Sequence, residues 1–116
     1  MIKELKRNGF YDARDVNMVV MSGHVFYEPN SADFTYSEDN GARFNFKIKT
    51  DGVAKTPQVF RVILWGKRAE EYYTLCHKDD YILIQGELRR NNWVDNKDIV
   101  HDDAEIVASK LELIGG

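Results

Sequence analysis

Histidine, cysteine and carboxylate side chains are the first candidates for chemistry, because they can bind metals, transfer protons or act as nucleophiles. His24, His77 and His101 are scattered along the chain, and Cys76 is its single cysteine. If Cys76 and His77 lie on one helix, their side chains diverge by about 100°. No two of these residues have the spacing of zinc ligands, so the sequence predicts no zinc site.

A second candidate is the acidic segment that contains Asp102, Asp103 and Glu105. Three nearby carboxylates could mimic a site for a divalent metal ion. On a β-strand, however, adjacent side chains point to opposite faces, which separates neighbouring carboxylates. The chain also has no glycine-rich phosphate loop and no nucleophile elbow. We therefore expect no catalytic residue, no bound metal, no cofactor and no enzymatic activity.

The basic side chains are distributed very unevenly. Residues 41–68 carry seven basic side chains and one aspartate, whereas residues 1–40 carry four basic and seven acidic side chains, and residues 69–116 carry five and eleven. The net charge of −3 therefore hides a basic centre between acidic flanks. Such a centre could be a face that binds a polyanion, or an ordinary solvated surface, and the charge counts leave both interpretations open.

Length and composition limit the classes of protein to which the chain can belong. A chain of 116 residues suits one compact domain, and its 43% hydrophobic content can supply a core. The apolar runs at 18–21 and 62–65 are only as long as strands, and the N-terminus has no apolar signal region. Together with the single cysteine, these features predict a cytoplasmic protein that does not bind membranes.

Hydrophobic periodicity predicts a chain built mainly of strands. The clearest strand is 43–49, in which Phe44, Phe46 and Ile48 share one face. Its other face carries Arg43, Asn45, Lys47 and Lys49. The other predicted strands are 18–21, 58–65, 81–88 and a closing strand that covers 99–106 and 109–114 in one piece or two.

Helical spacing and turn residues connect these strands. Gly23 permits a bend after the first strand, and a turn interrupts the segment 25–34. The segment 89–97 is predicted to be a polar hairpin, and the segment 67–77 a helix. The apolar positions that recur at helical spacing are Ala69, Tyr72, Tyr73 and Cys76.

The order of elements is therefore strand, strand, strand, helix, strand, strand. This order is typical of the OB-fold. We predict an all-β domain at 16–116, a five-stranded OB-fold barrel with one helix between strands 3 and 4. Residues 1–15 are predicted to form a short N-terminal arm.

Several segments, in order and at near-correct spacing, resemble those of bacterial-type single-stranded DNA-binding proteins. The first, Val-Asn-Met-Val-Val-Met-Ser-Gly-His at 16–24, resembles the opening strand of that family. The others are Tyr36 followed by Gly41-Ala42 and Phe44-Asn45-Phe46, then Phe60-Arg61-Val62-Ile63-Leu64-Trp65-Gly66-Lys67, Ile84-Gln85-Gly86-Glu87-Leu88-Arg89, Trp93 and Leu113-Ile114-Gly115-Gly116. The resemblance covers residues 16–116 and implies an OB-fold that binds single-stranded DNA without reading its sequence.

The chain departs from that family's pattern at several points. The stretch between Gly23 and Tyr36 is longer than usual, and the loop 50–57 is shorter and lacks a tryptophan. Val59 stands where many members carry a stacking tryptophan. Because the sequence stops where the family's folded domain stops, we expect a member without the linker and acidic tip that follow the barrel in bacterial members. Such a compact form suggests a bacteriophage-encoded member, acting in the cytoplasm of a bacterial host, or a truncated one.

The resemblance also implies which side chains contact nucleic acid, because cations follow the phosphates and aromatic rings stack on the bases. The expected residues are Tyr36, Arg43, Lys47, Lys49, Arg61, Trp65, Lys67, Arg89 and Trp93. Other roles stay open for some of them. Trp65 could be a core residue and Trp93 a structural one. Tyr36 could only buttress its loop, and Lys47 and Lys49 could be ordinary solvated lysines.

The resemblance implies partners as well as a ligand. We expect a homo-oligomer, with a tetramer favoured, that protects single-stranded DNA during replication, recombination or repair and meets proteins of those processes. Two other functions remain open. The barrel could be a primosomal-type replication adaptor that mainly holds proteins, or an RNA-binding OB domain, since stacking and phosphate contacts are similar for both polymers.

Overall fold

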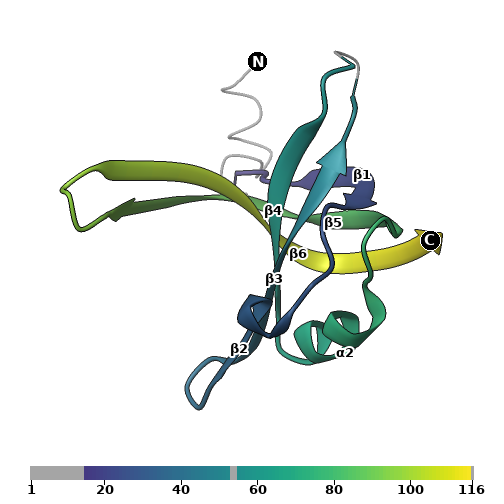
Figure 1. Cartoon of the computed structure of the whole chain (residues 1–116), viewed down its shortest axis with the longest axis horizontal. Helices are drawn as coiled ribbons and strands as arrows, with labels where there is room; N and C mark the ends of the chain where they lie inside the picture. The colour runs from purple at the N-terminus through teal and green to yellow at the C-terminus, as the bar shows by residue number, and fades with distance from the viewer. Residues whose placement is uncertain (1–14, 53–54, 116) are drawn as a thin grey trace, which may run out of the picture.

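The computed structural model describes residues 15–52 and 55–115, which form one mostly β domain with a closed ring of strands (Figure 1). The predicted N-terminal arm, residues 1–15, lies almost wholly outside this range. In chain order the elements are β1 (Val19–Val25), the 3-10 turn η1 (Ser31–Asp33), β2 (Phe34–Ser37), β3 (Gly41–Thr50), β4 (Gln58–Trp65), α2 (Lys67–Leu75), β5 (Tyr81–Val94) and β6 (Val100–Gly115).

The ring is closed by successive strand pairs. Strand β1 pairs with β5, β5 with β6, β6 with β4, and β4 with β3, which returns to β1 through His24↔Lys49 and Val25↔Ile48. Among the strand pairs of the described residues, only β4–β6 is parallel. Strand β2 lies outside the ring and pairs with β3. This arrangement is consistent with an OB-fold.

The described residues form six strands where the sequence predicts five. The additional strand is β2, which four residue pairs hold against β3. Most of its side chains are exposed, so the segment lacks the alternation of apolar and polar residues from which strands are recognised. The helix therefore follows the fourth strand of the chain. Among the five ring strands it lies between β4 and β5.

Strands β5 and β6 are longer than predicted. The predicted polar hairpin at 89–97 is present but longer, because residues 89–94 belong to β5 and pair with 100–105 of β6 around a turn at 95–99. Strand β6 is one continuous strand that pairs with β5 as far as Val94↔Val100. Backbone pairing, rather than apolar alternation, holds this part together. Residues 89–105 are here called the β5–β6 arm, which starts at the ring with the Arg89–Glu105 pair and projects well beyond it (Figure 1).

The core lies inside the ring and is closed at one end by α2. Phe44, Phe46 and Ile48 are fully buried, as the alternation in β3 predicts. The helix ends at Leu75, two residues before the predicted end, and the backbone N–H of His77 instead donates to the Asp80 side chain. Within the described ranges, no helix combines the length and apolar character needed to span a bilayer.

Two glycines permit close contacts between strands. Gly23 lies within β1 rather than at a bend after it, and a Cβ atom there would lie 2.6 Å from the carbonyl oxygen of Lys49. At Gly86 a Cβ atom would lie 2.1 Å from the carbonyl oxygen of Val107. Any side chain at these positions would force the neighbouring strands apart.

Candidate nucleic-acid interface

The outer face of β3 and β4 carries most of the predicted cations. Along β3, partly exposed residues alternate with buried ones, so Arg43, Lys47 and Lys49 point away from the core. Antiparallel pairing places Lys47 opposite Arg61 of β4 and Arg43 opposite Trp65. Cross-strand partners share a face of the sheet, so these predicted residues lie together.

The parallel pairing of β4 with β6 extends this face onto the β5–β6 arm. Arg61 is the register partner of Glu105 in β6, and Glu105 is the partner of Arg89 in β5. Lys47, Arg61, Glu105 and Arg89 therefore form one row across four strands. We call this set the charged row. In this register Glu105 lies between two arginines, and it is 1% exposed.

Trp65 lies at one end of this face rather than in the core. It is only partly buried, and the guanidinium carbon of Arg43 lies 5.7 Å from the centre of its ring. This distance is within the range of a cation–π contact, which fixes the ring relative to β3. The core interpretation of Trp65 is therefore wrong, because the ring is outside the cluster of buried side chains.

Trp93 lies near the tip of the β5–β6 arm and stacks on His101 of β6. The two ring centres are 4.1 Å apart and the ring planes differ by 10°. His101 is in turn held by Asp95, whose Oδ2 lies 2.9 Å from the imidazole Nε2. One face of the indole is thus covered, while 45% of Trp93 remains exposed and open to a second ring.

A hollow opens beside the charged row where β6 diverges from β4. It is lined by Lys47, Val59, Phe60, Arg61, Asp102, Asp103 and Ala104. Its β3–β4 side carries two cations, whereas its β6 side carries two aspartates. The groove is therefore basic on one side only. The Asp102 carboxylate pairs with the guanidinium of Arg90, a residue of the opposite face of the arm.

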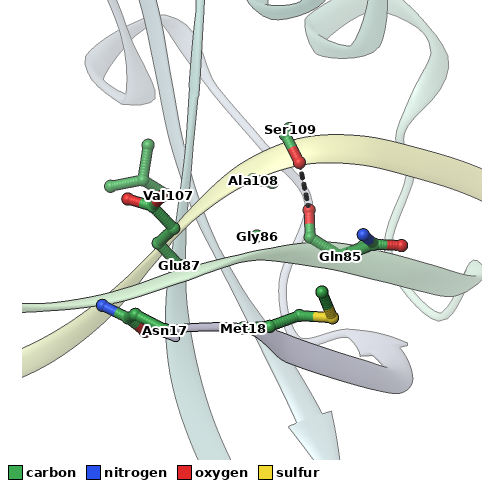
Figure 2. A pocket seen from close by; sticks show the side chains of 8 residues that line it. All are labelled: Asn17, Met18, Gln85, Gly86, Glu87, Val107, Ala108 and Ser109. Carbon is green, nitrogen blue, oxygen red and sulfur yellow. Dashed lines mark hydrogen bonds between the residues drawn. The ribbon is translucent and has the colours of Figure 1, made fainter. Parts of the chain in front are cut away.

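A second hollow lies where β1, β5 and β6 meet (Figure 2). Its floor is Gly86, and the Ser109 hydroxyl donates a hydrogen bond of 3.2 Å to the carbonyl oxygen of Gln85 beside it. Among the described residues that line it, Glu87 is the only charged one and none is aromatic. A polyanion with stacking bases therefore fits the hollow beside Lys47 and Arg61 better.

Two predicted residues lie apart from the charged row. Tyr36 of β2 pairs with Ala42, whereas Arg43 pairs with Thr35, so the tyrosine is on the opposite face of the sheet from Arg43. Its side chain is exposed there. Lys67 is the first residue of α2 and is exposed beyond the end of β4. Lys49, by contrast, points to the same side of β3 as Lys47 of the charged row and lies opposite Val59 of β4.

Two residues of this face were not predicted as part of it, Glu105 and His101. Both lie in β6, opposite Arg89 and Trp93 respectively. The predicted hairpin at 89–97 was too short to include them, whereas a turn at 95–99 makes them the partners of Arg89 and Trp93, because hairpin partners are symmetric about the turn. The polar composition of the segment concealed that symmetry.

Metal binding and nucleophilic attack are the other kinds of chemistry that these side chains could support. No group of three or more His, Cys, Asp and Glu side chains among residues 15–52 and 55–115 is arranged to hold a metal ion. Cys76 is buried, and desolvation raises the pKa of its thiol to about 12. A thiol with so high a pKa is a poor nucleophile at neutral pH.

Comparison with known proteins gives a consistent match. A model of the single-strand binding protein family matches residues 16–114. The chain is 26% identical over 113 residues to single-stranded DNA-binding protein 1 of Chlorobaculum tepidum, covering 89% of this chain and 67% of the relative. It is 26% identical over 108 residues to the single-stranded DNA-binding protein of Treponema pallidum, covering 87% and 59%.

A third relative, the single-stranded DNA-binding protein of Borreliella burgdorferi, is 27% identical over 88 residues, covering 70% of this chain and 57% of the relative. The chain thus spans between 57% and 67% of the length of these three relatives. Residues 16–114 include all the predicted contact residues.

The Asp95–His101 contact, which holds the ring beneath Trp93, should weaken at acid pH. Asp95 accepts from His101 and from the backbone N–H groups of Ile99 and Lys97, and these bonds, that of His101 first, hold its pKa below the ordinary value of 3.8. As the pH falls, Asp95 is therefore protonated at a higher pH in the unfolded chain than in the folded one. The stability that Asp95 contributes to the tip is fully present above pH 3.8 and is lost as the pH falls through the lower pKa of the folded state.

Amide NMR shifts of Ile99 and Lys97 measure this transition directly. We expect both to move together below pH 3.8 in the parent protein. Asp95→Asn keeps an oxygen for both amides but has no charge to lose, so its shifts should stay constant there. An unchanged titration in the variant would show that another group is responsible.

Proposed function

Because the chain belongs to the single-strand binding protein family, we propose that it binds single-stranded DNA without reading base sequence. The observation that carries the proposal is the shared face of β3, β4 and the β5–β6 arm. This face combines a row of cations with two outward aromatic rings, Trp65 and Trp93. The three relatives described above are named for the same activity.

Such a face has the two physical devices that bind unpaired strands. Phosphates are attracted by Arg43, Lys47, Lys49, Arg61 and Arg89, and binding releases counterions. Unpaired bases gain stacking energy on the open sides of Trp65 and Trp93, and every base has a face that can stack. Duplex DNA hides its base faces, so the rings favour single strands. The proposed contacts of DNA with Tyr36 and Lys67 require a bound DNA strand that extends beyond the charged row.

In this proposal the ring is an OB-fold barrel whose role is to protect single strands during replication, recombination or repair. The adaptor and RNA-binding alternatives predict different properties of this face. A pure adaptor needs no exposed stacking rings on a basic face, so Trp65 and Trp93 favour strand binding. An RNA-binding domain should prefer RNA through the 2′-hydroxyl. Titration with dT, dA and RNA oligonucleotides of equal length separates these functions.

The affinity for oligo-dT should fall steeply as salt concentration rises. If three to five cations contact phosphates, log K against log salt should have a slope of roughly −2 to −3.5. The slope for oligo-dA should be nearly the same, because the phosphates do not differ. Fluorescence anisotropy at four salt concentrations gives both slopes. A flat response, or tighter binding of duplex DNA, would contradict the proposal.

Trp65→Ala and Trp93→Ala should weaken oligo-dT binding while the protein stays folded. Each lost stacking ring typically costs about 1–3 kcal/mol of binding free energy. Val94→Ala is the matched control for Trp93, because Val94 is the next residue of β5, is exposed and faces the other side of the arm. Circular dichroism checks the fold and anisotropy the affinity. Equal binding by Trp93→Ala and Val94→Ala would exclude stacking at the tip.

The proposal includes self-association into a homo-oligomer, with a tetramer favoured. Val20 of β1 and Met18, which directly precedes this strand, are 60% and 62% exposed. From Val19 to Gly23, β1 pairs with β5 on one side and with no described strand on the other. An open edge with exposed apolar side chains favours pairing with the same strand of another copy.

Val20→Lys should dissociate this oligomer, because the charge would be buried at the contact between copies. Val100→Lys is the control, since Val100 is also exposed in a strand but lies at the arm tip. Light scattering at micromolar concentration should report an oligomer for the parent and the control and a smaller species for Val20→Lys. A monomeric parent would rule out the assembly.

A further inference from the structure

Glu105 is an unexpected residue in the middle of a cationic face. It is the one charged side chain that is buried among residues 15–52 and 55–115. Its register partners are Arg61 on β4 and Arg89 on β5, with Lys47 one strand further. A carboxylate here repels a phosphate backbone, so its presence calls for a physical reason.

The bonds between Glu105 and Arg89 use one edge of the guanidinium. Oε1 of Glu105 accepts from Nε of Arg89 at 2.9 Å and from Nη2 at 2.5 Å. A guanidinium has five N–H donors in a rigid plane. The remaining donors, both on Nη1 and one on Nη2, form no hydrogen bond with the described residues. The side chain of Arg89 is 49% exposed, so this second edge can reach a ligand in solvent.

The other oxygen of Glu105 indicates that the pair is not arranged for stability alone. Oε2 is buried and has no hydrogen-bond partner within the described part of the chain. A buried carboxylate oxygen without a donor costs free energy, and buried ion pairs are often no more stable than apolar packing. The cost is consistent with a role for this carboxylate at the binding face.

We propose that Glu105 is a positioning residue that holds Arg89 with its free edge toward a phosphate of the bound strand. The inference rests on the proposed binding of single-stranded DNA. Two parallel N–H donors on that edge match two phosphate oxygens, a geometry that lysine does not offer. Glu105 acts only through Arg89. It restricts the rotamers of a long side chain before binding, so less entropy is lost when the phosphate arrives.

The competing interpretation is that Glu105 merely reduces the positive charge of the face. The two interpretations predict opposite effects of Glu105→Ala. Loss of a negative charge alone should tighten binding of oligo-dT. Loss of positioning should weaken it by about three- to tenfold, as expected for poorly oriented charge-assisted hydrogen bonds. Glu105→Gln keeps the Oε1 acceptor without the charge and should bind as tightly as the parent or more tightly.

A double-mutant cycle with Arg89→Ala is the decisive measurement. If Glu105 acts through Arg89, Glu105→Ala should cause no further weakening in the Arg89→Ala background. The proposal is wrong if Glu105→Ala binds more tightly than the parent, or weakens binding equally in both backgrounds. Parent protein that does not bind oligo-dT would instead refute the proposed function, and this inference with it.

A second pair of variants tests the same geometry without touching Glu105. Arg89→Lys keeps the charge but lacks the rigid fork, so oligo-dT should bind several-fold more weakly with an unchanged salt slope. Arg90→Lys is the matched control, because Arg90 faces the other side of the arm and pairs with Asp102. Thermal melting verifies that each variant is folded. Equal affinities of these two variants would also overturn the proposal, even if Glu105→Ala fails to fold.

Discussion

The parallel pairing of β6 with β4 is the contact on which the rest of the structure depends. Only residues 61–63 and 105–107 form it, yet it joins the β3–β4 pair to the β5–β6 pair and closes the ring. Parallel neighbours need a long connection, which α2 and β5 provide. Arg61 and Glu105 are distant in sequence, so the charged row exists only when this contact has formed.

Local patterns in the sequence were sufficient to predict an element where one of its sides is buried and the other exposed. Strand β3 alternates strictly between core and outer residues, and that alternation predicted both its existence and its basic face. The same reasoning failed for β2 and for the outer half of β5, where both sides are exposed and backbone pairing alone defines the strand. The partners of Arg89 and Trp93 were missed for that reason, because they depend on hairpin register.

The acidic composition of the chain is compatible with a basic face because several carboxylates are already engaged. Glu105 accepts from Arg89, Asp102 pairs with Arg90, and Asp95 is bonded to His101. These contacts hold the two strands of the arm together and limit the repulsion that the arm exerts on a polyanion. Arg43, Lys47, Lys49 and Arg61 have no ion pair with the described residues, and the other outward positions of β3 and β4 themselves carry no carboxylate.

Some side chains of this face are held in place by a neighbour, and others are free to move. Trp65 is held by Arg43, Trp93 by His101 and Arg89 by Glu105, each from a neighbouring strand. Lys47 and Lys49 have no ion pair with the described residues and keep the rotamer freedom of long side chains. Fixed rings can accept any base, since all bases have a stacking face, and mobile lysines can follow whichever path the phosphates take. The indifference to sequence that we propose would follow from this division, because stacking on a ring and contact with a phosphate do not depend on which base is present.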